Sequence, residues 1–434
     1  MSAFRKFGLF GTAICGICVA KTALVKMATA NASEGESSDR FDDLRNRGLE
    51  LKMVQVFFRH GARTPLKGIP NPNNLPELET VWDKETLFAG GEHLMVDYQV
   101  KSLDGGQQPV MTIENRYRKT VFKGGTFAGQ MTTLGKSQMY DLGKIYKTHY
   151  IDNLKFLEPT FTTEHIYVRS TNIMRTIESA SCVLAGMFGE TMKKHGPVTI
   201  YTDGPETEYL YPNAGFCKKY KAFSSAFWHN SDQVPGVARF RRQLQDILGM
   251  PDSMYLDLVR MRDNLAAMEA HKLPIPRYLE PLMDIIDRRA TEIIKYYVTK
   301  SESEKKEVLQ VTCGQVLQMI RENIQSVDKG SYQKFHIYSC HDTTLVSMLC
   351  GLKIFDNRWP PYAADLIFEV YQDKDGRCFV RTLYIGKEQR IMNNPETIVP
   401  AERFLELTSE VAVTEERYNE ICEGTGEHVA TSAL

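Results

Sequence analysis

Three times along this 434-residue chain, a short apolar run gives way to polar residues and then to a helical pattern. The apolar runs are LKMVQVFF (51–58), HIYVRS (165–170) and FHIYSC (335–340). Each is short and rich in aromatic or β-branched residues, which is typical of a buried strand. Repeated strand–turn–helix units predict a parallel α/β sheet. Because the carboxyl ends of parallel strands lie at one edge, we expect the three polar turns to converge on one crevice.

The remaining segments predict how this sheet is completed. Residues 206–330 read as successive helices separated by proline-containing breaks, which indicates a mainly helical cap inserted into the core. The runs 365–371 and 378–386 flank a QDKDGR turn and predict a hairpin. We therefore predict a doubly wound, mainly parallel α/β core formed by residues 50–205 and 331–434.

Composition and missing motifs narrow the class of protein. Charged residues make up 25% and hydrophobic residues 42% of the chain, the balance of a globular protein. The net charge of −1 and the lack of a long basic run argue against a nucleic-acid partner. After residue 30 no apolar stretch approaches the roughly 18 residues of a membrane-spanning helix, so no stable span is expected in the mature domain. The sequence has neither a P-loop nor an H-E-x-x-H motif, and we predict no metal and no organic cofactor.

The first 32 residues have the composition of a targeting leader, followed by a polar linker at 33–49. Basic residues recur up to Lys26, and the first acidic residue is Glu34. The returning lysines favour a mitochondrial presequence. A secretory signal cleaved near ATANA, and a leader retained as an anchor, remain open alternatives.

The cysteines point in the same direction. Seven of the nine follow the leader, and this odd, scattered set is a weak disulfide framework. We therefore favour the mitochondrial route over the secretory or extracellular one.

The turn after the first strand, RHGARTP (59–65), predicts an anion-binding site. Arg59 and Arg63 present planar forks of fixed charge that match phosphate oxygens. Their field lowers the pKa of His60, and a neutral imidazole is a competent nucleophile toward phosphorus. Gly61 is expected to let the backbone approach the ligand closely, and Pro65 to fix the turn.

The other two turns supply further candidates. Arg169, at the end of the second strand, is expected to bind the remaining phosphate oxygens, whereas Arg175 in the following helix is expected to be structural. After the third strand, His341 is expected to contact phosphate and Asp342 to donate a proton to the leaving oxygen. We expect burial and the bound phosphate to raise the pKa of Asp342.

In their order along the chain, RHGARTP, VRST (168–171) and HD (341–342) at a helix start resemble the motifs of the histidine acid phosphatases. This family forms branch two of the phosphoglycerate-mutase-like superfamily, and the resemblance covers about residues 50–410. FKGGTFAGQ (122–130) and IFDNRWPPYAADL (354–366) are similar to stretches of members that hydrolyse lysophosphatidate.

The resemblance implies a role for each matched residue. His60 would be the nucleophile and Asp342 the proton donor, with phosphate bound by the remaining candidates, Arg59, Arg63, Arg169 and His341. It implies hydrolysis of a phosphomonoester, in particular lysophosphatidate to monoacylglycerol and phosphate, without a cofactor. Other phosphomonoesters, such as inositol phosphates, phosphotyrosine or small esters, and a non-catalytic lipid-binding role are the alternatives.

Overall fold

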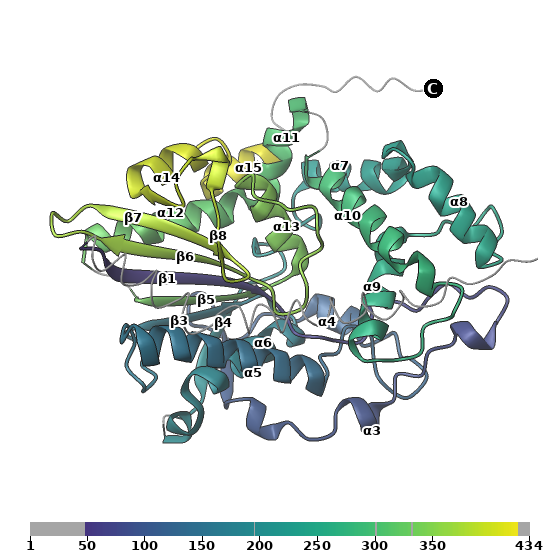
Figure 1. The fold of residues 1–434 in the computed structure, drawn as a ribbon, viewed down its shortest axis with the longest axis horizontal. Coiled ribbons are helices and arrows are strands. Elements are labelled where there is room, and N and C mark those ends of the chain that lie inside the picture. Colours follow the sequence, from purple (N-terminus) through teal and green to yellow (C-terminus); the bar gives the residue numbers. More distant parts are fainter. Residues whose placement is uncertain (1–47, 195, 300–301, 331–332, 424–434) are drawn as a thin grey trace, which may run out of the picture. The chain divides into compact units, whose positions relative to one another are not determined.

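The computed structural model describes residues 48–194, 196–299, 302–330 and 333–423, and residues from Leu49 onward form one compact unit (Figure 1). The predicted leader (1–32) and the linker as far as residue 47 lie outside the described residues. Among the helices that are described, none is both long enough and apolar enough to cross a membrane.

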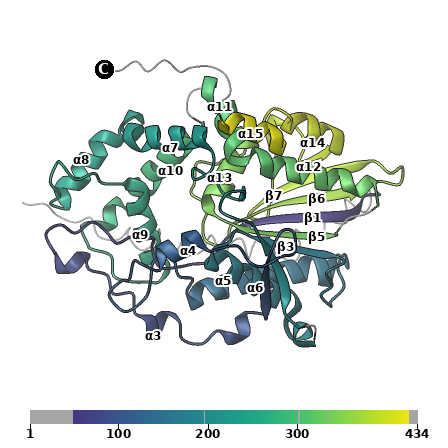
Figure 2. The same cartoon turned by 180° about the vertical axis from the view of Figure 1, so that it is seen from behind.

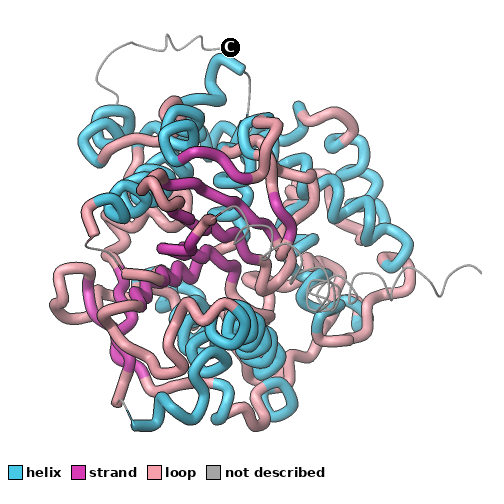
Figure 3. Tube along the Cα trace, turned by 60° about the vertical axis from the view of Figure 1, so that its left-hand side comes forward, coloured by secondary structure: helices cyan, strands magenta, loops and turns pink. Residues whose placement is uncertain are grey.

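A nine-stranded mixed sheet forms the centre of this unit, with helices on both of its faces (Figure 3). In spatial order the strands are β2 (Tyr98–Ser102), β4 (Val198–Thr202), β3 (Ile166–Ser170), β5 (Phe335–Cys340), β1 (Glu50–Arg59), β6 (Asp365–Gln372), β7 (Cys378–Tyr384) and β8 (Lys387–Glu388), with β9 (Ile398–Pro400) beside β7. The first five strands run parallel, and β6 and β7 form the antiparallel hairpin. The predicted α/β fold class is confirmed. The sequence analysis did not predict β2 and β4, because β2 is a half-exposed edge strand and β4 alternates buried with half-buried residues and has no continuous apolar run.

Alternation along β1 divides the core into two apolar layers. Val54, Val56 and Phe58 face α5 (Thr133–Tyr146) and α6 (Met174–Phe188). Helix α5 ends at Tyr146 and is followed directly by a π-helical segment, Lys147–Asn153.

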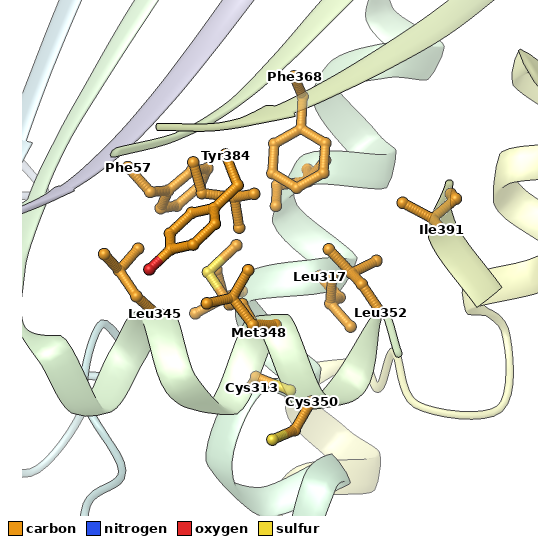
Figure 4. Close-up of a cluster of buried hydrophobic side chains, with 14 of the residues drawn as sticks. Phe57, Cys313, Leu317, Leu345, Met348, Cys350, Leu352, Phe368, Tyr384 and Ile391 are labelled. Carbon is orange, nitrogen blue, oxygen red and sulfur yellow. The ribbon is translucent and has the colours of Figure 1, made fainter. Parts of the chain in front are cut away.

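The opposite face of the sheet packs against α12 (Gln315–Asp328), α13 (Asp342–Gly351) and α14 (Ala401–Thr408). Figure 4 shows this layer, in which Phe57 and Phe368 from the sheet lie over Leu345 and Met348 of α13. Helices on both faces make the sheet doubly wound, as predicted.

The helices of residues 206–330 fall into two groups (Figure 2). The bounds of those before α12 are α7 (Lys218–Asn230), α8 (Val237–Ile247), α9 (Leu258–Ala270), α10 (Met283–Thr299) and α11 (Glu302–Leu309). Helices α8, α9 and α10 share an apolar cluster that includes Leu244, Met261 and Ile286, and α10 also contributes to the cluster that covers the sheet. In contrast, α12 covers the sheet through residues such as Ile320. The remaining helices are α3 (Lys84–Leu87), α4 (Thr112–Tyr117) and α15 (Glu415–Glu423).

A disulfide joins Cys217, at the start of α7, to Cys422 in α15. The other cysteines in the described ranges are free and buried: Cys182, Cys313, Cys340, Cys350 and Cys378. The odd cysteine set therefore does contain a structural pair, so cysteine usage no longer favours the mitochondrial route over the secretory one.

Candidate active site

The turns that follow β1, β3 and β5 meet because these three strands are neighbours and run parallel. The His60 backbone N–H donates to the carbonyl oxygen of Cys340 at 3.2 Å, and the Thr171 N–H donates to that of Ser339 at 3.2 Å. These two hydrogen bonds extend the pairing of β1 and β3 with β5 by one residue beyond the ends of β1 and β3. They hold three segments, far apart in the chain, around one crevice.

His60 is poised as a neutral imidazole with one ring nitrogen available. Its Nδ1 lies 2.9 Å from the Gly61 carbonyl oxygen, which can only accept, so Nδ1 carries the proton and Nε2 keeps its lone pair. The side chain is 1% exposed. Burial, together with Arg175, Arg63 and Arg59, holds the pKa of His60 well below its usual value.

Gly61 is required by a contact with α5. A Cβ at this position would lie 2.3 Å from the Gly135 carbonyl oxygen, closer than any side chain can approach. The Ala62 N–H then donates to Gln138 Oε1 at 2.8 Å. Close approach of the α5 N-terminus is thus a reason for glycine at this position that the sequence did not indicate, and the predicted close approach to a ligand stays a prediction.

The Arg59 guanidinium is fixed from three sides. It lies 4.2 Å from the centre of the Tyr362 ring, and its Nη1 donates to the Pro360 carbonyl oxygen at 2.7 Å. Its Nη2 is 3.1 Å from Asp342 Oδ2. The arginine that ends β1 and the aspartate that follows β5 thus form an ion pair inside the crevice.

Arg63 is held by Asp263 of α9, a partner that the sequence reading missed. Its Nη1 and Nη2 bind the two carboxylate oxygens at 3.2 and 3.0 Å, and Asp263 also accepts from the Leu66 N–H at 3.1 Å. Arg63 Nε is buried without a hydrogen-bond partner among the described residues. Asp263 therefore occupies the outer fork of Arg63 and leaves Nε available to an anion.

His341 and Asp342 open α13, as expected, although the helix begins at Asp342 with His341 as its N-cap residue. The His341 ring lies 5.6 Å from the His60 ring, and its Nε2 is 3.0 Å from Thr171 Oγ1. Asp342 Oδ2 accepts from the Trp359 indole N–H at 2.9 Å.

The electrostatics of Asp342 differ from the prediction. Burial alone would raise its pKa, but Arg59, the Trp359 hydrogen bond and Arg63 together hold the pKa of Asp342 well below its usual range. The expected upward shift is therefore not found without phosphate: burial acts in the expected direction, but the two guanidinium groups and the Trp359 hydrogen bond outweigh it. A phosphate group beside Asp342 would add negative charge and oppose the arginines.

The structure does not bring Arg169 into the cluster. In the sheet Arg169 pairs with Tyr338, which on its other side pairs with Phe57. Arg59 instead pairs with Cys340, two residues further toward the carboxyl ends of the strands. Its Nη2 lies 3.1 Å from Glu208 Oε1, and its guanidinium is stacked 4.1 Å from the Tyr209 ring centre. The sequence predicted that Arg169 would lie beside His60 at the phosphate site. The structure places it outside this cluster, because Glu208 and Tyr209 cover its guanidinium group.

Arg175 takes the place that Arg169 was expected to fill. It lies in the first turn of α6, is 4% exposed, and is the charged group with the largest effect on the pKa values of both His60 and His341. Its Nε and Nη1 have no hydrogen-bond partner in the described part of the chain. The first turn of a helix that follows a parallel strand borders the crevice, and this signal could have identified Arg175 from the sequence.

The assembled site can bind a phosphate group and attack it. Arg59, Arg63 and Arg175 surround a neutral His60, and their unpartnered N–H groups match the oxygens of a dianion. Asp342, whose Oδ2 lies 3.1 Å from Arg59 Nη2, could act as a proton donor. The described residues contain no group of three or more side chains suited to a metal ion.

Known proteins are similar to this chain in sequence and in fold. The model of the histidine phosphatase superfamily (branch 2) matches residues 50–385. Lysophosphatidic acid phosphatase type 6 of Homo sapiens is 36% identical over 383 residues, which cover 87% of each chain. The protein of the same name from Bos taurus is 34% identical, with 96% of each chain covered. Among solved structures, the apo form of Hafnia alvei phytase matches with a TM-score of 0.54 at 13% identity, covering 84% of this chain and 98% of the phytase.

Proposed function

Because the chain belongs to branch 2 of the histidine phosphatase superfamily and is a phosphatase acting on phosphomonoesters, we propose that its substrate is lysophosphatidate. The products would be monoacylglycerol and inorganic phosphate. The similarity to the human and bovine lysophosphatidic acid phosphatases, over nearly the whole chain, supports this substrate. The observation that carries the chemistry is the buried neutral His60, with Nε2 available and three arginines around it.

In the proposed mechanism, His60 Nε2 attacks phosphorus in line with the leaving oxygen. The new N–P bond forms as the P–O bond to the alcohol breaks, and Asp342 in its acid form gives its proton to the departing oxygen. Arg59, Arg63 and Arg175 bind the non-bridging oxygens and stabilise the charge on them, with His341 at the same crevice. Water then attacks the phosphohistidine, and the Asp342 carboxylate takes its proton. Breaking the N–P bond releases phosphate and restores the neutral imidazole.

Phosphate release from matched substrates tests both the substrate and the nucleophile. We expect the full chain to hydrolyse lysophosphatidate with a higher kcat/KM than phytate or an aryl phosphate. Equal values for all three would reject the lipid assignment. No release from any of them would favour the non-catalytic lipid-binding alternative.

His60→Ala should abolish the acid-labile phosphoenzyme that can be trapped by rapid quenching. His336→Gln is the matched control, because His336 is also a buried histidine but lies on β5 and contacts the Gln333 carbonyl oxygen. Phosphate release that persists after His60→Ala would remove the assignment of the nucleophile.

We also propose a mitochondrial location, directed by residues 1–32, with the secretory route as the alternative. The Cys217–Cys422 disulfide requires an oxidising compartment on either route. A reporter fused to residues 1–49 and imaged against mitochondrial and secretory markers distinguishes the two.

A further inference from the structure

A cavity beside His341 takes no part in the chemistry described above. Its walls are formed by three segments: Val110, Thr112 and Ile113; Asn172 and Ile173 ahead of α6; and Asp203, Pro205, Glu208 and Tyr211 after β4. The Tyr211 ring lies edge-on to the His341 ring at 5.9 Å. Asn172 directly follows Thr171, whose hydroxyl contacts His341 Nε2. The cavity therefore adjoins the phosphate site along the His341 side.

Glu208 places an unsatisfied hydrogen-bond acceptor at this cavity. The residue is 2% exposed, and its Oε1 accepts from the Leu210 N–H at 2.7 Å and from Arg169 Nη2 at 3.1 Å. Its Oε2 is buried and has no hydrogen-bond partner among the residues that the structure describes. Buried carboxylate oxygens are rarely left unpaired, so this atom has the capacity to accept a hydrogen bond from a ligand.

The chemistry of the wall identifies the kind of donor. A carboxylate repels a second phosphate group, which excludes a polyphosphorylated ligand at this position. The other carboxylate of the wall, on Asp203, is already engaged, since its Oδ1 accepts from the Gly204 N–H and the Thr207 hydroxyl. A neutral hydroxyl group can donate one hydrogen bond to Glu208 Oε2 and fits beside the aromatic ring of Tyr211.

We propose that Glu208 Oε2 accepts a hydrogen bond from a hydroxyl group on the carbon next to the phosphate-bearing carbon of the substrate. Glu208 is then a specificity-determining residue for 2-hydroxyalkyl phosphates. The preference for 2-hydroxyalkyl phosphates is argued from the cavity, whereas the choice of lysophosphatidate as the member of this class rests on the proposed function. Lysophosphatidate has a free hydroxyl group at that carbon, whereas phosphatidate has an ester there and cannot donate.

Two matched pairs of substrates test the proposal. The lipid pair is 1-acylglycerol 3-phosphate and its 2-deoxy analogue with the same acyl chain. The short pair is glycerol 3-phosphate and 3-hydroxypropyl phosphate. In both pairs we expect the unaltered protein to favour the 2-hydroxy member in kcat/KM by about 10-fold, the effect of one hydrogen bond to a charged acceptor.

Variants at Glu208 should remove this preference. Glu208→Gln replaces Oε2 by a donor, and Arg169→Met with Glu208→Met removes the buried ion pair as a whole, which protects the fold from an unpaired charge. In both variants we expect the ratio within each pair to fall to near one. Asp203→Asn is the matched control: Asp203 faces the same arginine at 3.6 Å and lines the same cavity, so the ratio should be retained.

Two results would overturn the proposal: equal hydrolysis of both members by the unaltered protein, or Glu208 variants that slow both members equally and keep their ratio. The second result would show that Glu208 only supports Arg169. Selectivity in the short pair with poor hydrolysis of both lipids would support the hydroxyl site while rejecting lysophosphatidate as the substrate. Rapid hydrolysis of both lipids without selectivity would support a lipid substrate and reject the hydroxyl site.

Discussion

Arg169 and Arg175 belong to the same strand–helix unit, but only the charge of Arg169 is balanced by nearby carboxylates. Arg169 lies against Glu208 and Asp203, at 3.1 and 3.6 Å. Arg175 is stacked on the Tyr117 ring, and two of its nitrogens lack hydrogen-bond partners in the described ranges. A compensated buried arginine stabilises the fold, whereas an uncompensated one is available to an anionic substrate.

We therefore predict that removing one side chain affects mainly activity and that removing the other affects mainly stability. Arg175→Ala should lower kcat/KM by about 10²–10³-fold, because a charge-stabilising donor is lost from the transition state. Arg169→Ala should lower the free energy of unfolding by about 3–5 kcal/mol, because it leaves Glu208 buried without its counter-ion.

Phosphate-release kinetics and denaturant titration of both variants measure these effects. Arg175→Lys should recover part of the activity, since it restores the charge but not the planar fork. Full activity of Arg175→Ala in a folded protein would contradict the assignment of Arg175 to the phosphate site.

Helix α9 supports the active site through side chains spread along its length. Arg262 stacks on the Trp359 ring at 4.5 Å, Asp263 holds Arg63, and His271 at its C-terminal end contacts Thr132 Oγ1 at 2.8 Å. Trp359 donates to Asp342, and Thr132 caps the helix that packs on Gly61. Helix α9, from the 206–330 segment, therefore helps to position the residues around the nucleophile.

At this scale we predict that Asp263→Asn lowers kcat by about 10-fold with a smaller change in KM. The amide cannot hold both Nη atoms of Arg63 as a charged fork, so the arginine loses orientation that matters most in the transition state. Steady-state kinetics that separate kcat from KM measure the effect.

Asp287→Asn is the control on the neighbouring helix α10. Asp287 pairs with Arg262 Nε at 2.8 Å but does not hold Arg63. Equal losses of kcat in both variants would mean that α9 is only loosened, and that Asp263 has no special role in positioning Arg63.

For the whole molecule, the Cys217–Cys422 disulfide closes a loop with a sequence separation of 205 residues. It ties α7, the first helix of the 206–330 segment, to α15, the last helix described. A cross-link over such a long loop greatly restricts the unfolded chain.

We predict that Cys217→Ala with Cys422→Ala lowers the free energy of unfolding by about 5 kcal/mol on the chain-entropy model, with kcat nearly unchanged. Urea titration and activity assays measure the two quantities. A reducing agent should shift the unaltered protein by a similar amount and leave the double variant unaffected. A reductant effect that is equal in both proteins would assign the shift to another group.

The sequence by itself determined the repeated strand–turn–helix units, and with them most of the active-site residues. Strand ends are set by local apolar patterns, and parallel strands bring their carboxyl ends to one edge whatever the rest of the chain does. For this reason His60, Arg59, Arg63, His341 and Asp342 could all be placed in one crevice from the sequence.

Only the tertiary structure decided the features that depend on which segments lie against each other. The choice of Arg175 over Arg169 depends on Glu208, which closes over Arg169 from a separate loop. The lowered pKa of Asp342 depends on Arg59, from a strand far away in the chain. The disulfide and the Arg63–Asp263 pair likewise join residues about 200 positions apart. Local patterns carry no information about such contacts, because the geometry of the packed chain determines which distant side chains meet.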